Sequence, residues 1–209
     1  MRVLPEGAAE VVSAVIRRRR SIKPADFSDR QVDAATVRQL LEAAHWAPTH
    51  GMTEPWRFRV FMGQSRLELA NVLEGVLRQI TPESETLRVK VEKQQRAIFA
   101  APCCVAIGMY RQRSGKIPET EEIAAVACGV QNLHLLATAL GLAGSWSSGV
   151  AICSAEFRDY PGLQDPDRVL GLFYLGYPAV AWPSGTRSSL DQKIVWRRDA
   201  ASDPCSERH

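Results

Sequence analysis

The sequence has 209 residues, of which 45% are hydrophobic and 23% are charged, and its net charge is +3. These values favour one globular domain over residues 1–209, and the charge is too small to indicate nucleic-acid binding by itself. The N-terminus lacks the apolar run of a signal peptide, and no segment has membrane-spanning length. We therefore expect a cytoplasmic protein that binds neither membranes nor nucleic acids.

Hydrophobic periodicity predicts several helices in the first half of the chain. Apolar residues recur at helical spacing over residues 8–19, which end in a run of arginines. Asp33 is a suitable N-cap for a helix over residues 34–46, and Ser65 is one for a helix that reaches about residue 80. Residues 56–62 alternate and are aromatic and β-branched, which predicts a strand.

The second half of the chain is centred on one long helix. A charged surface helix over residues 84–99 and a short buried strand over residues 103–109 precede it. The long helix is predicted over residues 120–140, with Gly141 just past its end. It is apolar around most of its circumference, which is typical of a helix at the centre of a domain or in an interface. The remaining predicted strands cover residues 143–149 and 169–178.

The chain from Val180 onward has two tryptophans, several basic residues and little periodicity. It cannot form a core of its own, so we expect it to lie along another surface. Helices interleaved with few strands predict an α+β fold with a small sheet covered by helices.

The five cysteines include no CxxC pair, and four of them (Cys103, Cys104, Cys128 and Cys153) lie in apolar surroundings. The pattern favours reduced core thiols and argues against a zinc site. Reduced thiols are typical of the cytoplasm.

The basic stretch RRRRSIKP, residues 17–24, is open to two interpretations. Arginines at a helix C-terminus complement the helix dipole and are usually solvated. The alternative is an anion site, because Arg19, Arg20, Ser21 and Lys23 in an extended chain would present cations and a hydroxyl to one side. A phosphate group prefers such donors.

A second stretch, WAPTHGMTEPWRF, joins a predicted helix to a predicted strand. Its prolines fix the backbone, His50 and Glu54 supply polar groups, and Trp46 and Trp56 supply flat apolar surface. Individually, a histidine is more often structural and a strand tryptophan is more often a core residue. Together they indicate a loop that holds a flat ligand on a rigid frame.

Two further segments carry weaker signals. The stretch GLAGSWSSG at residues 141–149 has small residues, which let a backbone approach a ligand closely. It is equally interpretable as a tight connection with Trp146 packed in the core. Arg187 is a single arginine in the tail, and only its context suggests a binding role.

Taken in order, RRSIK, LLEAAHWAPTHGMTEPWRF, LGLAGSW, GLFYLGYP and a tail with a proline, an arginine and a tryptophan resemble the nitroreductase family of FMN-dependent NAD(P)H oxidoreductases. The chain is most similar to the compact subgroup whose loop is APxHxxxxPWRF. The resemblance implies a mostly antiparallel sheet and an intertwined obligate homodimer with FMN in its interface. It also implies that residues 180–209 wrap the partner subunit.

The resemblance assigns cofactor-binding residues by position. The N-terminal basic element would bind the phosphate, the ribitol and the pyrimidine edge of FMN, and Arg187 would also bind the phosphate. The segment around Trp146 would lie beside the dimethylbenzene and N5 side of the flavin ring. Two loop residues would reach the flavin of the other subunit. These candidates are Arg19, Arg20, Ser21, Lys23, Arg187, Trp146, Ser147, Ser148, Trp46 and His50.

The implied activity passes electrons from NAD(P)H through flavin N5 to nitroaromatics, quinones or related electron-poor small molecules, with no catalytic side chain and no metal. Other chemistry on the same scaffold stays open, namely dehalogenation, dehydrogenation or flavin breakdown. A non-catalytic flavin-binding protein is a second alternative. A nucleic-acid binder is a third, and Glu42, Glu68 and Glu74 argue against its broad basic face.

Two loop positions depart from many relatives, because Met52 and Glu54 stand where those have Asn and Gln. Glu54 would either repel a reduced, anionic flavin or turn away and pair with an arginine such as Arg57. For residues 80–118, which shape substrate access in relatives, the sequence assigns no functional residue.

Overall fold

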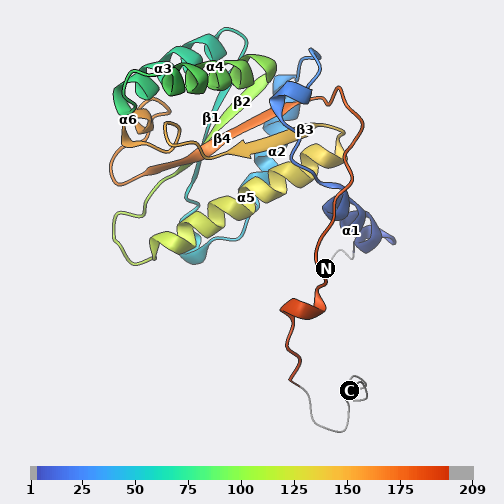
Figure 1. The fold of residues 1–209 in the computed structure, drawn as a ribbon. Helices are drawn as coiled ribbons and strands as arrows, with labels where there is room; N and C mark the ends of the chain where they lie inside the picture. Colours follow the sequence, from blue (N-terminus) through green and yellow to red (C-terminus); the bar gives the residue numbers. More distant parts are fainter. Residues whose placement is uncertain (1–3, 198–209) are drawn as a thin grey trace.

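Four strands form one sheet in the computed structural model, which describes residues 4–197 (Figure 1). They are β1 (Trp56–Met62), β2 (Cys103–Met109), β3 (Ala143–Ser147) and β4 (Arg168–Gly176). Their order across the sheet is β1-β2-β4-β3, and every neighbouring pair is antiparallel. The predicted α+β fold with a small antiparallel sheet is confirmed.

The predicted helices are all present, and their ends differ from the predicted ones by at most one residue. They are α1 (Ala8–Arg18), α2 (Ala34–His45), α3 (Ser65–Ile80), α4 (Glu85–Ala100) and α5 (Glu119–Ala139). The short helix α6 (Ala155–Arg158) and the 3-10 turns η1 (Pro24–Asp26), η2 (His50–Met52) and η3 (Asp191–Lys193) were not predicted, because they are too brief to show a period. Among the helices of residues 4–197, none is long and apolar enough to cross a membrane.

Helices cover both faces of the sheet, so β2 is buried along its whole length. Successive side chains of a strand point to opposite faces. Cys104 and Ala106 accordingly join the core beneath α3 and α4, whereas Val105 and Ile107 join the core against α2 and α5 (Figure 1). The continuous apolar run CCVAIGM follows from this double coverage.

Helix caps show which local predictions succeed. The Asp33 carboxylate accepts a hydrogen bond from the backbone N–H of Thr36 at 2.7 Å, and Gly141 has φ of 75° after the end of α5. The predicted cap at Ser65 is wrong. The Ser65 hydroxyl instead donates to the carbonyl of Met62 at 2.8 Å, because the tight turn after β1 brings that carbonyl within reach.

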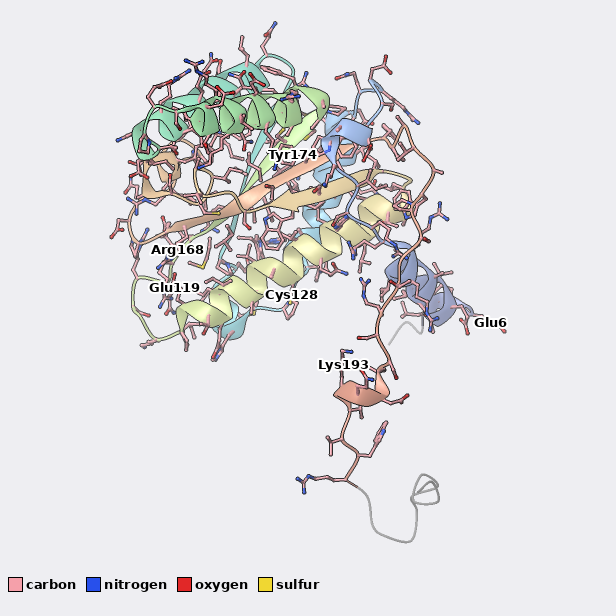
Figure 2. The ribbon with its side chains drawn as sticks, viewed as in Figure 1. Glu6, Glu119, Cys128, Arg168, Tyr174 and Lys193 are labelled. Atoms are coloured by element: carbon pink, nitrogen blue, oxygen red, sulfur yellow. The ribbon has the colours of Figure 1, made fainter. Side chains whose placement is uncertain are left out.

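The cysteines divide into two classes, and the prediction of four core thiols is half wrong. Cys103 and Cys104 are buried in the sheet, and burial raises the pKa of the Cys103 thiol to about 12. Cys128 and Cys153 are exposed. Cys128 lies on the outer side of α5, where a helix apolar around its circumference keeps one face uncovered in a single chain (Figure 2). Cys205 lies outside the described residues.

The two ends of the chain pack little against this body. Helix α1 has no buried residue and lies near the C-terminal end of α5 (Figure 1). The segment after β4 returns past α1 and then extends away from the domain, with η3 near its described end (Figure 1). The expectation that the tail forms no core of its own is confirmed over residues 180–197.

Candidate functional site

The N-terminal basic element leaves α1 and runs beside β3. Arg19 is extended, with φ of −54° and ψ of 126°. Ser21 forms a parallel bridge with Gly144, and the N–H of Ile22 donates to the carbonyl of Gly144 at 3.1 Å. Because Ile22 is buried, the alternating chain leaves Ser21 and Lys23 exposed on the other side. The structure thus has the extended geometry that the anion-site interpretation requires.

A buried histidine fixes this element to α5. The Nε2 of His134 donates to the backbone oxygen of Arg20 at 3.0 Å, and the imidazole stands edge-on to Phe173 with ring centroids 5.1 Å apart. Burial, followed by the charge of Arg19, lowers the pKa of His134 to about 4. His134 is therefore neutral at physiological pH. Sequence patterns did not indicate this contact, since a histidine in an apolar helix has many possible partners.

Three guanidinium groups gather where α1 ends. Burial, the charge of Arg187 and the charge of Arg20 together lower the pKa of Arg19, in that order of importance. None of these three arginines forms an ion pair with a carboxylate of residues 4–197. The Nε of Arg20 is buried and lacks a hydrogen-bond partner among the same residues. Such a cluster of unneutralised cations with a spare donor suits an anion with several oxygens.

The tail supplies part of this cluster from the same chain. Trp182 donates its indole N–H to the carbonyl of Arg18 at 2.6 Å. The backbone of Gly185 lies so close to Arg20 that a Cβ there would be 2.2 Å from the guanidinium carbon. A larger residue at position 185 would displace the guanidinium of Arg20 from this position. Residues 182–187 therefore hold Arg187 near Arg19 within one subunit, an arrangement that sequence patterns did not indicate.

Strand β3 offers an open edge next to these cations. Since the carbonyl of Gly144 points outward to Ile22, the alternation of the backbone directs the N–H and C=O of Trp146 to the same outer edge. The Trp146 side chain is 38% exposed and lies over Gly171, where a Cβ would be 2.3 Å from its indole nitrogen. Trp146 is thus not a core residue. Ser147 is half-buried and Ser148 is exposed beside it.

A cavity of about 1210 Å³ opens between this edge and α4. Of the predicted residues, Lys23, Trp146 and Ser147 line it. Its far wall comes from the segment for which sequence reasoning assigned nothing, and it includes Lys90 and Lys93. The spacing of these lysines places them on one helix face, but a surface helix commonly carries such residues.

The floor of the cavity contains a buried tyrosine, Tyr174 of β4 (Figure 2). The Nε2 of Gln94 donates to its hydroxyl at 2.7 Å. Burial raises the pKa of Tyr174 well above its usual range, so the phenol stays protonated at physiological pH. With Gln94 as a donor to its oxygen, the Tyr174 O–H remains available to an acceptor.

The loop WAPTHGMTEPWRF lies elsewhere on the same chain. His50 pairs with the carboxylate of Glu121 in the first turn of α5, whereas Arg20 contacts His134 in a later turn. At 1.5 Å per residue, these two points lie about 20 Å apart along the helix. One subunit therefore does not bring His50 and Trp46 to the arginine cluster, which leaves contact across a dimer as their predicted role. Trp46 is 85% exposed.

The remaining residues of the WAPTHGMTEPWRF loop stabilise the conformation of that loop. Trp56 is buried, and its indole N–H donates to Nδ1 of His45 at 3.0 Å, so it is a structural residue. Met52 and Glu54 have positive φ values of 52° and 43°. The guanidinium of Arg57 donates to the backbone carbonyl of Glu54 at 3.0 Å, and their side chains form no ion pair within the described part of the chain.

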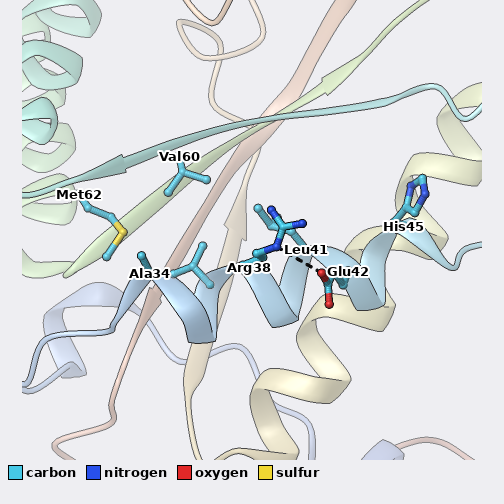
Figure 3. Close-up of a pocket in the computed structure, with 8 residues that line it drawn as sticks. Ala34, Arg38, Leu41, Glu42, His45, Val60 and Met62 are labelled. Carbon is cyan, nitrogen blue, oxygen red and sulfur yellow. Dashed lines mark ion pairs between the residues drawn. The ribbon is translucent and has the colours of Figure 1, made fainter.

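A second hollow of about 470 Å³ lies between α2 and β1 (Figure 3). Leu41, Val60 and Met62 make it mainly apolar, and its charged residues Arg38 and Glu42 pair with each other at 3.3 Å. It contains none of the predicted site residues. Within residues 4–197, no group of three His, Cys, Asp or Glu side chains could hold a metal ion.

Comparison with known proteins identifies the scaffold. The nitroreductase family model matches residues 16–177. The Bacillus subtilis (strain 168) protein "Putative NAD(P)H nitroreductase YfhC" is 28% identical over 169 residues, which cover 80% of this chain and 84% of the relative. The crystal structure of a nitroreductase-like family protein from Bacillus cereus superposes with a TM-score of 0.77 at 27% identity, covering 94% of this chain and 98% of the other.

A more distant structure shows the same fold. The FMN-dependent nitroreductase NfnB from Mycobacterium smegmatis, in complex with NADPH, has a TM-score of 0.68 at 19% identity. It covers 91% of this chain and 99% of the other. The family match spans more than half of the sequence. This chain belongs to the nitroreductase family.

Proposed function

We propose that this protein is an FMN-dependent oxidoreductase that takes electrons from NAD(P)H and passes them to nitroaromatics, quinones or related electron-poor small molecules. The observation that carries the proposal is the cluster of Arg19, Arg20 and Arg187 at one end of an open strand edge, beside a large cavity. Family membership supports the same conclusion. So does the NADPH complex of the FMN-dependent relative from Mycobacterium smegmatis.

The residues present fit FMN. Its phosphate would bind the three arginines, because their charges lack carboxylate partners and the Nε of Arg20 lacks an acceptor among residues 4–197. Its ring system would lie along the outer edge of β3, where Trp146 offers backbone groups. Ser21, Lys23, Ser147 and Ser148 surround the same edge.

When bound, FMN supplies reversible hydride and electron transfer. The protein positions the ligands and stabilises negative charge. Lys23 adds a cation to the cavity wall, where it would stabilise the charge of a reduced ring more than that of an oxidised one. The backbone at Trp146 orients the ring without a side-chain acid or base.

The proposed assembly is a homodimer that completes each site. The outer face of α5 carries the exposed small or polar residues Ala124, Cys128, Gln131 and Ala139. Helix α1 exposes Val12 and Ile16, which are 55% and 50% accessible. The exposed apolar side chains of α1 are typical of an interface, and the small side chains of α5 would allow a second helix to pack closely. In the dimer, Trp46 and His50 would reach the partner's flavin. The tail was predicted to wrap the partner over residues 180–209, and because Trp182 and Gly185 contact their own N-terminal element, we propose this role for the part after Arg187.

The visible spectrum of the purified protein tests the proposal, followed by anaerobic titration with NADH and NADPH. We expect flavin absorption in the blue, loss of that absorption on addition of a reduced nicotinamide, and recovery on addition of a nitroaromatic or quinone. A bound flavin that neither nucleotide bleaches would instead identify a non-catalytic flavin-binding protein. A colourless protein that ignores added FMN would end the proposal.

A further inference from the structure

The cavity beside β3 has cations on its α4 wall that the proposed function does not use. The described residues that line it include four cations, namely Lys23, Lys90, Lys93 and Arg96, and no carboxylate. The guanidinium of Arg96 forms an ion pair with the carboxylate of Glu92, with an N–O distance of 3.1 Å. The three lysines form no ion pair with any carboxylate of the described chain. The cavity therefore has an uncompensated positive field.

The lysines are arranged around a largely apolar hollow. Lys90 and Lys93 are one helical turn apart on α4 and are exposed. Ala97 of the same helix, Ile152 and Trp146 of β3 also line the cavity. A ligand that fills this space has its apolar part among these side chains and its charged part near α4.

We propose that the electron acceptor of this enzyme is an aromatic molecule that carries an anionic group, such as a carboxylate, sulfonate or phosphate, and that Lys90 and Lys93 bind that group. The aromatic part occupies the apolar region against Trp146. The inference rests on the proposed function, because it concerns the second substrate of the same site. The low-dielectric walls of the cavity strengthen the attraction relative to a flat surface.

The phosphates of NAD(P)H are also anionic and could bind the same lysines. The experiment therefore distinguishes an anionic acceptor from the electron donor. The acceptors are 4-nitrobenzoate and 4-nitrobenzamide, which have similar size and shape but differ in charge. The variant is Lys90→Gln/Lys93→Gln in the holoenzyme. Lys116→Gln is the matched control, because Lys116 is exposed in the loop before α5 and does not line this cavity.

For the variant we expect kcat/KM with 4-nitrobenzoate to fall about five- to tenfold, as two partly exposed charge pairs are lost. The value with 4-nitrobenzamide should change by less than about twofold, and so should both values in the control. High salt should reduce the preference of the unmodified enzyme for the anionic acceptor.

Three results would overturn the inference. Equal losses with both acceptors would assign the lysines to flavin binding or folding. A loss confined to flavin reduction by NADPH in rapid mixing would assign them to the dinucleotide phosphates. An unmodified enzyme with no preference for the anion would exclude anion recognition.

A binding measurement keeps the inference separate from the proposed activity. Calorimetric titration of the oxidised holoenzyme with the two acceptors measures their affinities without turnover. We expect tighter binding of 4-nitrobenzoate, and the double variant should remove the difference. If NADPH fails to bleach the flavin while this difference persists, the proposed activity fails and the anion site stands. If turnover occurs with no difference in binding, the anion site fails alone.

Discussion

Replacing Arg19 by alanine should weaken FMN binding without harming the fold. Arg19 is half-buried at the end of α1, and burial together with the charges of Arg187 and Arg20 lowers its pKa. A charge-assisted hydrogen bond contributes about 1.5–3 kcal/mol. Its loss corresponds to a roughly 10- to 150-fold higher dissociation constant for FMN.

The apoprotein provides the distinguishing readout for Arg19→Ala. If Arg19 were structural, its removal would lower the unfolding midpoint of the flavin-free protein. We expect the midpoint to stay the same or rise, because the substitution removes repulsion among three cations. The stabilisation by added FMN should fall as the affinity falls.

Fluorescence titration of apoprotein with FMN measures the affinity, and calorimetry measures the midpoint. Arg88→Ala is the control, since Arg88 forms only an exposed pair with Glu85 at 3.9 Å and should change neither value. An Arg19→Ala protein that retains full FMN affinity would refute the phosphate site. A destabilised apoprotein would show that Arg19 maintains the fold.

Three other predictions concern buried charge and assembly. His134 has a pKa of about 4 in the folded protein against 6.5 when unfolded, so the unfolded state binds more protons between these values. In urea titrations, the free energy of unfolding should therefore fall by up to about 3 kcal/mol as the pH drops from 6.5 to 4. His134→Gln should reduce this dependence of the unfolding free energy on pH, and an unchanged dependence would contradict the prediction. Cys128→Glu should dissociate the proposed dimer in sedimentation experiments and lower FMN content, while Ser114→Glu in an exposed loop should not; a dimer that survives would place the interface elsewhere. Glu122 is 1% exposed and pairs with Arg111, so Glu122→Ala should lower the unfolding free energy by about 3–5 kcal/mol. A loss below about 1 kcal/mol would show that the pair contributes little.

The sequence patterns predict the secondary structure well because each long element carries a periodic signal. The run CCVAIGM and the alternating WRFRVFM match their strands to the residue. The error at Ser65 has a local cause. The Ser65 hydroxyl could cap the helix or bond to the preceding turn. It bonds to the turn because the carbonyl of Met62 lies within hydrogen-bond distance.

The site is only partly accessible to sequence reasoning. RRSIK indicated an anion site because an extended chain would present its cations and its hydroxyl to one side. The contact of His134 with Arg20 and the wall made by Lys90 and Lys93 depend on how α5 and α4 pack, and packing leaves no local signature. His50 pairs with Glu121, far along α5 from the arginine cluster, so its predicted role depends on contact across a dimer, which sequence patterns within one chain do not encode.

The central claim is that Arg19, Arg20 and Arg187 bind the phosphate of a flavin. Comparison of FMN with riboflavin tests it most directly. Riboflavin has the same ring and lacks the phosphate. Titration of the apoprotein should give a dissociation constant for FMN at least about 100-fold lower than that for riboflavin, because two or more charge-assisted contacts are absent. Arg19→Ala should narrow this difference. Equal affinity for the two flavins would contradict the account.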